Sequence, residues 1–356
     1  KVVMQASKNG FFYVLDRTTG KFISATAFVD GVTWANGIDS TTGRPLESPS
    51  AYAGTKPVLV SPDPEGAHNW YPMAFDASKG LVYLGVHHGG LMLHAPDPKW
   101  TSDVTMWNLG RDARYEGALV AKLRRAPAPR GELLAWNPVE RRAAWRVSLP
   151  VSQSGGVLAT AGNLVFQGRA DGIFTAYRAT DGSKLWEFNA GTGIMAPPVT
   201  YLAGGKQYLT LMVGWGGPMG LMNLPNMGPV RPGFGRILTF ALGGTANFVP
   251  SPYGHAASPV PAIRFDTTAE AIREGGFLYS TYCWTCHGIN VIAGPVPDLR
   301  YSTAEVHGQF EQIVRGGARK TLGMPSFADK LASQQVRAIQ AYVLSRAEAA
   351  RVEKRR

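Results

Sequence analysis

The sequence lacks any apolar run long enough to span a bilayer, so we expect no transmembrane helix. It is also poor in charge, because only 17% of its residues are charged against 45% that are hydrophobic. That balance excludes an intrinsically disordered chain and is typical of a globular protein. With 356 residues, the chain is long enough for two domains.

The sequence also lacks an initiating methionine. Residue 1 is lysine, which leads directly into the strand-like segment Val2-Val3-Met4 without a signal peptide or a capping element. We therefore expect the chain to be a fragment or a processed product whose N-terminal part is missing.

Acidic residues are in deficit, since 36 Lys and Arg face 25 Asp and Glu, a formal net charge of +11. A protein with such a positive net charge can bind nucleic acid, an anionic membrane surface or an acidic protein partner. The basic residues are mostly scattered, and short runs such as Glu140-Arg141-Arg142 are not interleaved with stacking aromatics. We therefore expect a solvated basic surface that meets an acidic redox partner, and no nucleic-acid binding.

Glycine (42), proline (25) and tryptophan (9) are plentiful, which favours many short strands joined by tight turns. The segment from Ala135 to Trp145 aligns with the segment from Ala176 to Trp186, at an offset of 41 residues. Val14 to Lys21 falls in the same register, with Ser24 at the tryptophan position. A period near forty with four short strands is typical of a β-propeller blade, and we expect about four blades.

Both cysteines lie in one motif, Cys283-Trp284-Thr285-Cys286-His287. A Cys-x-x-Cys pair alone could be a redox dithiol or half of a zinc site. The adjacent His287 favours haem, because two thiols one helical turn apart can bond both vinyl groups of a haem while the histidine binds its iron. A zinc site needs two further ligands, and no other cysteine exists. The motif predicts a c-type cytochrome. Because such haem attachment normally occurs outside the cytoplasm, we expect a periplasmic protein.

The segments around the motif fit a cytochrome c domain. Asp266 to Glu270 is typical of a helix N-terminus, and a short helix from Ala271 to Tyr282 then leads to the cysteines. Pro297 precedes the pair Asp298-Leu299 and resembles the proline whose carbonyl accepts the second ring N–H of the haem histidine in c-type cytochromes.

A methionine before the last helix is expected as the sixth ligand of the haem iron. Met324, in Gly323-Met324-Pro325, fits that place, ahead of a final helix expected over residues 332–353. Thioether and imidazole ligation raise the iron potential and block substrate access, which suits electron transfer. The alternative role for Met324 is core packing.

The repeated turn, Ala-x-Asp-x-x-Thr-Gly-x-x-x-Trp, resembles the tryptophan-docking motif of the quinoprotein dehydrogenases. With the haem motif behind it, the chain looks like a quinohaemoprotein alcohol dehydrogenase from Lys8-Asn9-Gly10 to Gly323-Met324-Pro325. The resemblance implies a mainly β plus α fold. It consists of the C-terminal blades of an eight-bladed propeller that holds pyrroloquinoline quinone (PQQ) beside calcium, followed by an all-α, class I-like cytochrome c domain. We expect blades over residues 1–245, a linker over 246–263 and the cytochrome c domain over 264–356.

The repeat alignment itself indicates where a ligand would lie. It places Lys8, His87 and Trp215 in equivalent turns of different blades, and Asn69-Trp70 just before the first strand of a blade. Propeller topology puts both kinds of turn on one face, so these residues should converge near one rim of the channel. Neighbouring residues on a strand point to opposite sides, so His87 and His88 are not expected to share a metal.

The resemblance gives these residues roles. It implies that Lys8 contacts the quinone and stabilises negative charge on it, that Asn69 and Trp70 are a cofactor-contacting pair, and that Trp215 is the indole near the cofactor rim. A solvated turn lysine and a blade-core Trp70 are the alternatives.

Several features of the resembled family are absent and are expected upstream: the catalytic Asp base, the calcium ligands and a vicinal Cys-Cys ring. With two cysteines, both in the haem motif, the chain cannot hold that ring. Residues 152–156 also depart from the tryptophan-containing form of the family, which puts the substrate range in doubt.

The resemblance implies oxidation of primary or secondary alcohols to aldehydes or ketones, with electrons leaving through the haem to a blue copper protein or a soluble cytochrome c. The chain alone is expected to be inactive. Two alternatives are a non-catalytic propeller–cytochrome electron carrier and a quinohaemoprotein that acts on polymeric alcohols or sugars.

Overall fold

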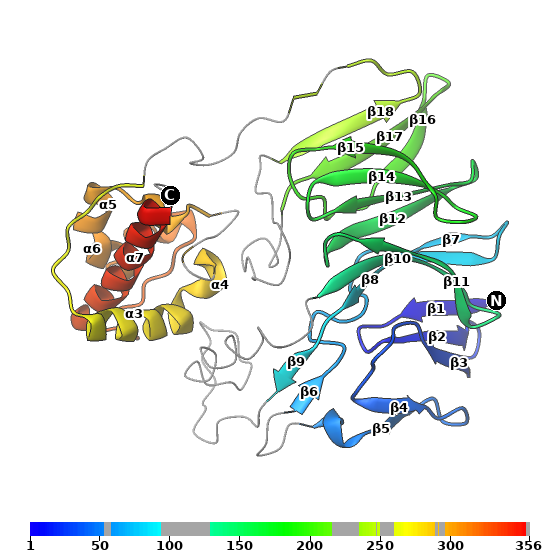
Figure 1. Cartoon of the computed structure of the whole chain (residues 1–356), viewed down its shortest axis with the longest axis horizontal. Helices are drawn as coiled ribbons and strands as arrows, with labels where there is room; N and C mark the ends of the chain where they lie inside the picture. The colour runs from blue at the N-terminus through cyan, green and yellow to red at the C-terminus, as the bar shows by residue number, and fades with distance from the viewer. Residues whose placement is uncertain are drawn as a thin grey trace. The chain divides into compact units, whose positions relative to one another are not determined.

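The computed structural model describes residues 1–52, 58–93, 129–215, 235–246, 248–249, 260–288, 291 and 296–353. These residues fall into two compact units, one built of strands and ending at residue 249, the other helical and beginning at residue 260 (Figure 1). Most of the expected linker over 246–263 lies outside the described residues.

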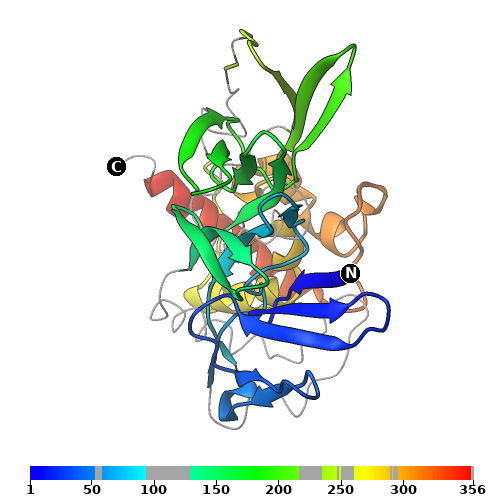
Figure 2. The ribbon, with the colours of Figure 1, turned by 90° about the vertical axis from the view of Figure 1, so that its right-hand side faces the viewer.

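Within the described residues, the first unit contains four antiparallel sheets of three or four strands. They are β1 (Val2–Ala6), β2 (Phe11–Asp16) and β3 (Phe22–Ala27); β7 (Ala74–Asp76), β8 (Leu81–His88), β10 (Arg130–Asn137) and β11 (Arg142–Leu149); β12 (Ser154–Thr160), β13 (Leu164–Arg169), β14 (Ile173–Arg178) and β15 (Lys184–Asn189); and β16 (Val199–Ala203), β17 (Lys206–Val213) and β18 (Arg236–Ala241). In Figures 1 and 2 these sheets follow one another in chain order as propeller blades, which confirms the expected fold and the count of about four.

Two short strand pairs and a 3₁₀ turn lie between the strands of the first two blades in the sequence. The two-stranded pairs are β4 (Ala35–Ile38) with β5 (Pro45–Glu47), and β6 (Val58–Val60) with β9 (Leu91–Leu93); a 3₁₀ turn, η1, covers Pro49–Ala51.

The strand registers confirm the repeat. Ala135 lies opposite Trp145, Ala176 lies opposite Trp186, and a β-bulge follows directly after each alanine. Val14 and Ser24 pair in the same way, again with a bulge after Val14. The three turns therefore share one backbone geometry, which the 41-residue offset between Trp145 and Trp186 anticipated.

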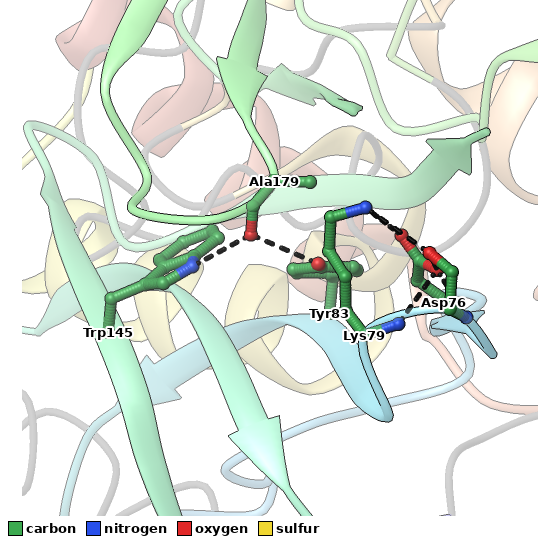
Figure 3. A network of polar contacts seen from close by, with 6 residues as sticks. Asp76, Lys79, Tyr83, Trp145 and Ala179 are labelled. Atoms are coloured by element: carbon green, nitrogen blue, oxygen red, sulfur yellow. Dashed lines mark hydrogen bonds and ion pairs between the residues drawn. The ribbon is translucent and has the colours of Figure 1, made fainter. Parts of the chain in front are cut away.

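Tryptophan docking joins neighbouring blades (Figure 3). The indole N–H of Trp145 and the hydroxyl of Tyr83 both donate to the carbonyl oxygen of Ala179 in the next blade, each at 3.0 Å. The two rings pack with centroids 5.7 Å apart. Lys79 and Asp76, 2.9 Å apart, close the turn before β8. Because Ala179 is fully buried, its carbonyl must find donors inside the protein.

The second unit is helical, as a cytochrome c domain should be. Its elements are α3 (Ala269–Tyr282), α4 (Trp284–His287), η4 (Leu299–Tyr301), α5 (Ala304–Gly308), α6 (Phe310–Val314), η5 (Lys320–Leu322) and α7 (Ser333–Glu353). Thr268 caps α3 by accepting a hydrogen bond from the Ala271 N–H at 3.1 Å. The two helices expected over 271–282 and 332–353 are confirmed. None of the described helices is long and apolar enough to cross a membrane.

Helices α3 and α7 touch backbone to backbone. A Cβ atom on Gly275 would overlap the carbonyl oxygen of Ala338, so only glycine permits this approach. Beside it, the rings of Tyr279 and Tyr342 pack with centroids 5.3 Å apart. The crossing fixes α3, and α3 leads directly into the cysteine motif.

Candidate functional site: a haem-attachment turn and a cofactor rim

The haem motif forms one turn at the end of α3. The N–H of Cys283 donates to Tyr279 O at 2.8 Å, and the N–H of His287 donates to Cys283 O at 2.9 Å. Cys283, Cys286 and His287 therefore lie within one helical turn, the spacing that covalent haem attachment needs. Both thiols are unpaired, with Cys283 partly buried and Cys286 exposed.

His287 has the environment of a metal ligand. Burial lowers its pKa, so the ring stays neutral and its nitrogen lone pair is available to iron. Its Nδ1 atom is buried and has no hydrogen-bond partner within the described part of the chain. Pro297 is exposed there, and residues 292–295 of the same loop lie outside the described residues. The contact between Pro297 and His287 therefore stays a prediction.

Met324 lies at the border of the apolar cluster of the helical unit. It packs partly buried against this cluster, as do Cys283, Trp284 and Phe310. Gly323, with φ of 94°, turns the chain ahead of it, and the Met324 N–H donates to Arg319 O at 3.2 Å. Met324 thus borders the same apolar cluster as Cys283, and the set of two thiols, an imidazole and a thioether fits haem c. Ligation by Met324 itself stays a prediction.

On the blades, the repeat places Lys8 and Trp215 in turns correctly, but its placement of His87 in a turn is wrong, because His87 belongs to strand β8. Lys8 is in the turn between β1 and β2, His87 is near the end of β8, and Trp215 follows β17. Asn69 and Trp70 precede β7.

Lys8 lies against the loop of residues 63–67. Its Nζ atom donates to Pro64 O at 3.0 Å, and its own carbonyl accepts the Ala67 N–H at 2.9 Å. A Cβ atom on Gly66 would come within 2.7 Å of the Lys8 Cα atom. Lys8 is exposed, yet its backbone and its ammonium group are both held by this loop.

Asn69 belongs to the same loop. Its Nδ2 atom donates to Glu65 O at 3.0 Å, and its Oδ1 atom accepts the Trp70 N–H at 2.9 Å. Trp70 is 66% exposed, which excludes the alternative that it is blade core.

A cleft brings three segments of the blades together. It is lined by residues 65–69 with Tyr71, by 85–87 and by 152–154, and so includes Asn69 and His87. Burial raises the pKa of Tyr71 to about 12 and lowers that of His68. Burial and the charge of Asp63 raise the pKa of Glu65. Lys8 does not line the cleft itself but packs against Gly66, which does. Trp70 and Trp215 do not line the cleft.

Trp215 is a buried residue that does not line this cleft. Only 8% of it is exposed, and its indole nitrogen has no hydrogen-bond partner among the described residues. A Cβ atom on Gly193 would overlap the indole ring, so the ring lies directly against the glycine backbone. A buried N–H without a partner is typical of a residue whose hydrogen bond is made to a bound cofactor.

No three metal-ligating side chains come together in the part of the chain that the structure describes. His87 contacts Asp63 at 3.1 Å and His88 contacts Glu132 at 3.3 Å, so the two histidines do not share a partner.

Sequence reasoning missed Asp63, Glu65 and Gly193. Asp63 and Glu65 sit in an ordinary loop sequence, Ser-Pro-Asp-Pro-Glu-Gly, which carries no motif. Gly193 could have been found only from its contact with Trp215, which the fold creates.

Two family models match the chain. The model "Glucose/ethanol/alcohol dehydrogenase, beta-propeller domain" matches residues 123–209, and "Cytochrome C oxidase, cbb3-type, subunit III" matches residues 270–343. The first match lies on the blades and the second on the helical unit.

Curated relatives extend the likeness to nearly the whole chain. The quinohemoprotein alcohol dehydrogenase ADH IIB of Pseudomonas putida is 44% identical over 97% of this chain and 49% of its own length. The quinohemoprotein alcohol dehydrogenase of Comamonas testosteroni is 39% identical over 99% of this chain and 49% of its own length. The chain thus spans about half the length of the relatives it matches.

Solved structures agree. The quinohemoprotein alcohol dehydrogenase ADHIIG of Pseudomonas putida HK5 superposes with a TM-score of 0.83 at 40% identity, covering 98% of this chain and 52% of that one. The Comamonas testosteroni enzyme gives a TM-score of 0.76 at 37% identity, covering 98% and 51%.

Proposed function

Because the chain belongs by sequence and by fold to the quinohaemoprotein alcohol dehydrogenases, we propose that the complete protein oxidises primary or secondary alcohols to aldehydes or ketones. The observation that carries this proposal is the union, in one chain, of a haem-attachment turn at Cys283–His287 with the blades of a quinoprotein propeller. PQQ accepts a hydride when bound, and haem c carries electrons onward singly.

The residues of the blades hold and polarise the quinone in this proposal. The ammonium group of Lys8 would donate to quinone oxygens and so favour negative charge on the ring. Asn69 offers an amide beside it, and the orphaned N–H of Trp215 offers a further donor. The base that takes the alcohol proton and the ligands of calcium are assigned to residues beyond those described.

The residues of the helical unit hold the haem. Cys283 and Cys286 form the two thioether bonds, and His287 and Met324 bind the iron. Pro297 orients His287 by accepting its second ring N–H. We assign the blades to residues 1–245, the cytochrome c domain to residues 264–356, and the join to residues 246–263.

We also propose a periplasmic location and a soluble acceptor, a blue copper protein or a cytochrome c. Covalent haem attachment supports the location. The net charge of +11 supports an acidic acceptor surface, because opposite charges speed association.

The test uses the full-length protein. The purified protein is loaded with PQQ and calcium, mixed with ethanol and then with longer alcohols, and followed by haem absorbance. We expect the haem to become reduced only when alcohol and PQQ are both present. If no alcohol reduces the haem while dithionite does, the protein is not an alcohol dehydrogenase and the proposal fails.

A further inference from the structure

His87 is a buried histidine that the proposed chemistry leaves without a role. It is 9% exposed and lies near the end of β8. Its Nε2 atom lies 3.1 Å from Asp63 Oδ2, and its Nδ1 atom lies 3.4 Å from the carbonyl oxygen of Ser152. Both partners only accept hydrogen bonds, so the ring satisfies both only as imidazolium.

The charges around the ring agree with that state. Burial alone would lower the pKa of His87, but the hydrogen bonds to Asp63 and Ser152 and the charges of Asp63 and Glu65 together outweigh it, and the pKa lies above its usual value. The titratable groups that face His87 are Asp63 and Glu65 on the loop of residues 63–67. Lys8 faces Glu65 from the turn between β1 and β2. His68 and Tyr71 line the same cleft, and the Ser152 carbonyl faces His87 from the segment just before β12.

Asp63 uses both carboxylate oxygens to shape the loop. Oδ2 accepts from His87, while Oδ1 accepts the Glu65 N–H at 2.9 Å. The Asp63 backbone closes the turn, since its carbonyl accepts the Gly66 N–H at 2.8 Å and its N–H donates to Gly89 O at 3.1 Å. A Cβ atom on Gly89 would overlap both Asp63 and His87, so the pair packs tightly against that glycine.

The turn that Asp63 closes presents two carbonyl groups to the proposed quinone ligands. Pro64 O holds the Lys8 ammonium group and Glu65 O holds the Asn69 amide. We propose that the Asp63–His87 pair positions Lys8 and Asn69 for the quinone by holding this turn. His87 and Asp63 are thus positioning residues, and the inference rests on the proposed function because it assumes that the two side chains contact PQQ.

The test measures PQQ affinity in the calcium-loaded full-length protein, by quenching of tryptophan fluorescence, and needs no turnover. His87→Gln keeps one donor but loses the charge and the second bond. We expect the dissociation constant to rise about tenfold to a hundredfold, the range seen when groups that orient a bound ligand's contacts are removed. His88→Gln, one residue along and facing Glu132, is the matched control and should change affinity less than twofold, as expected away from the contact.

The pH dependence separates positioning from general damage. Because the pKa of His87 is raised in the folded protein, its contribution is complete at low pH and is lost as the pH rises through that pKa. PQQ affinity of the unmodified protein should therefore fall with rising pH, and the His87→Gln protein should not show this step. Asp63→Asn retains an acceptor for the Glu65 N–H and can donate to neutral His87, so this variant should keep most of the affinity of the unmodified protein but lack the pH step.

A further measurement asks whether His87 acts on PQQ binding through Lys8 and Asn69. In a protein lacking both contacts, Lys8→Ala with Asn69→Ala, adding His87→Gln should weaken PQQ binding less than about twofold, because the pair acts through those side chains. Equal losses in the two backgrounds, or affinity and pH profile unchanged in His87→Gln, would overturn the inference. If the unmodified protein itself does not bind PQQ, the proposed function fails with it, so the two failures are distinguishable.

Discussion

The helical unit and the blades build their candidate sites in opposite ways. The haem turn uses three residues within five consecutive positions, Cys283 to His287, held by helix hydrogen bonds. The candidate cofactor residues of the blades, Lys8, Asn69, His87 and Trp215, come from separate segments of the chain. A site of the first kind depends on one local turn. A site of the second kind depends on loops and blade docking, so changes far away in sequence should weaken it gradually rather than abolish it.

The largest effect should come from the local site. Replacing both thiols, Cys283→Ser with Cys286→Ser, removes both thioether bonds, and we expect complete loss of covalent haem on a denaturing gel stained for haem. PQQ affinity should change less than about twofold, because the blades hold their own contacts. Covalent haem in the double variant would mean that the motif is not the attachment site. Loss of PQQ binding would mean that the two sites are not independent.

The next effect also concerns the haem but leaves it attached. Met324→Ala removes the predicted thioether ligand, so the sulfur-to-iron absorption band should disappear and the reduction potential should fall. Met212→Ala, at a 61% exposed methionine on β17, is the control and should keep the band. A band that persists in Met324→Ala would assign the sixth ligand to another residue and leave Met324 with core packing.

A graded effect is expected at the rim. Gly193→Ala would drive a Cβ atom into the Trp215 ring, so the indole must shift, and PQQ should bind about tenfold more weakly, as when a positioning contact is displaced. Gly162 is the matched control, since a Cβ atom there would meet only Thr160 Oγ1, at 3.7 Å. Affinity is measured by fluorescence titration at fixed calcium. Equal affinity of the two alanine variants would remove Trp215 from the cofactor contacts.

The sequence could predict the site formed by adjacent residues better than the site formed by separate loops. The haem turn and the helices beside it followed from adjacent residues, and the blades followed from a repeat whose bulges after Val14, Ala135 and Ala176 are identical. Those features depend on local geometry, which residue spacing encodes directly. The turns that carry Lys8, Asn69 and Trp215 were also placed correctly by the repeat.

Contacts between separate loops could not be predicted. The Lys8 ammonium group bonds to Pro64, and His87 on β8 bonds to Asp63, and both partners lie in a loop that the repeat does not align. Their geometry depends on how the loop of residues 61–69 folds against its neighbours, and its sequence is compatible with many conformations. The exposure of Trp70 likewise follows from that loop and not from its residue type.

The smallest expected effect tests blade docking, on which the rim depends. Trp145→Phe removes the indole N–H that donates to Ala179 O at 3.0 Å, and should lower the free energy of unfolding by about 1 kcal/mol. Tyr83→Phe removes the second donor to the same oxygen and should cost a similar amount. The double variant should lose more than the sum, by about 1 kcal/mol or more, because the buried carbonyl then has neither side-chain donor.

Denaturant unfolding followed by tryptophan fluorescence measures these costs, with Trp186→Phe as the matched control. Trp186 occupies the equivalent position one repeat later but is 42% exposed, so its loss should cost less. Strict additivity of Trp145→Phe and Tyr83→Phe would show that the Ala179 carbonyl finds another donor. The rim should then tolerate loss of either hydrogen bond, because another donor replaces it.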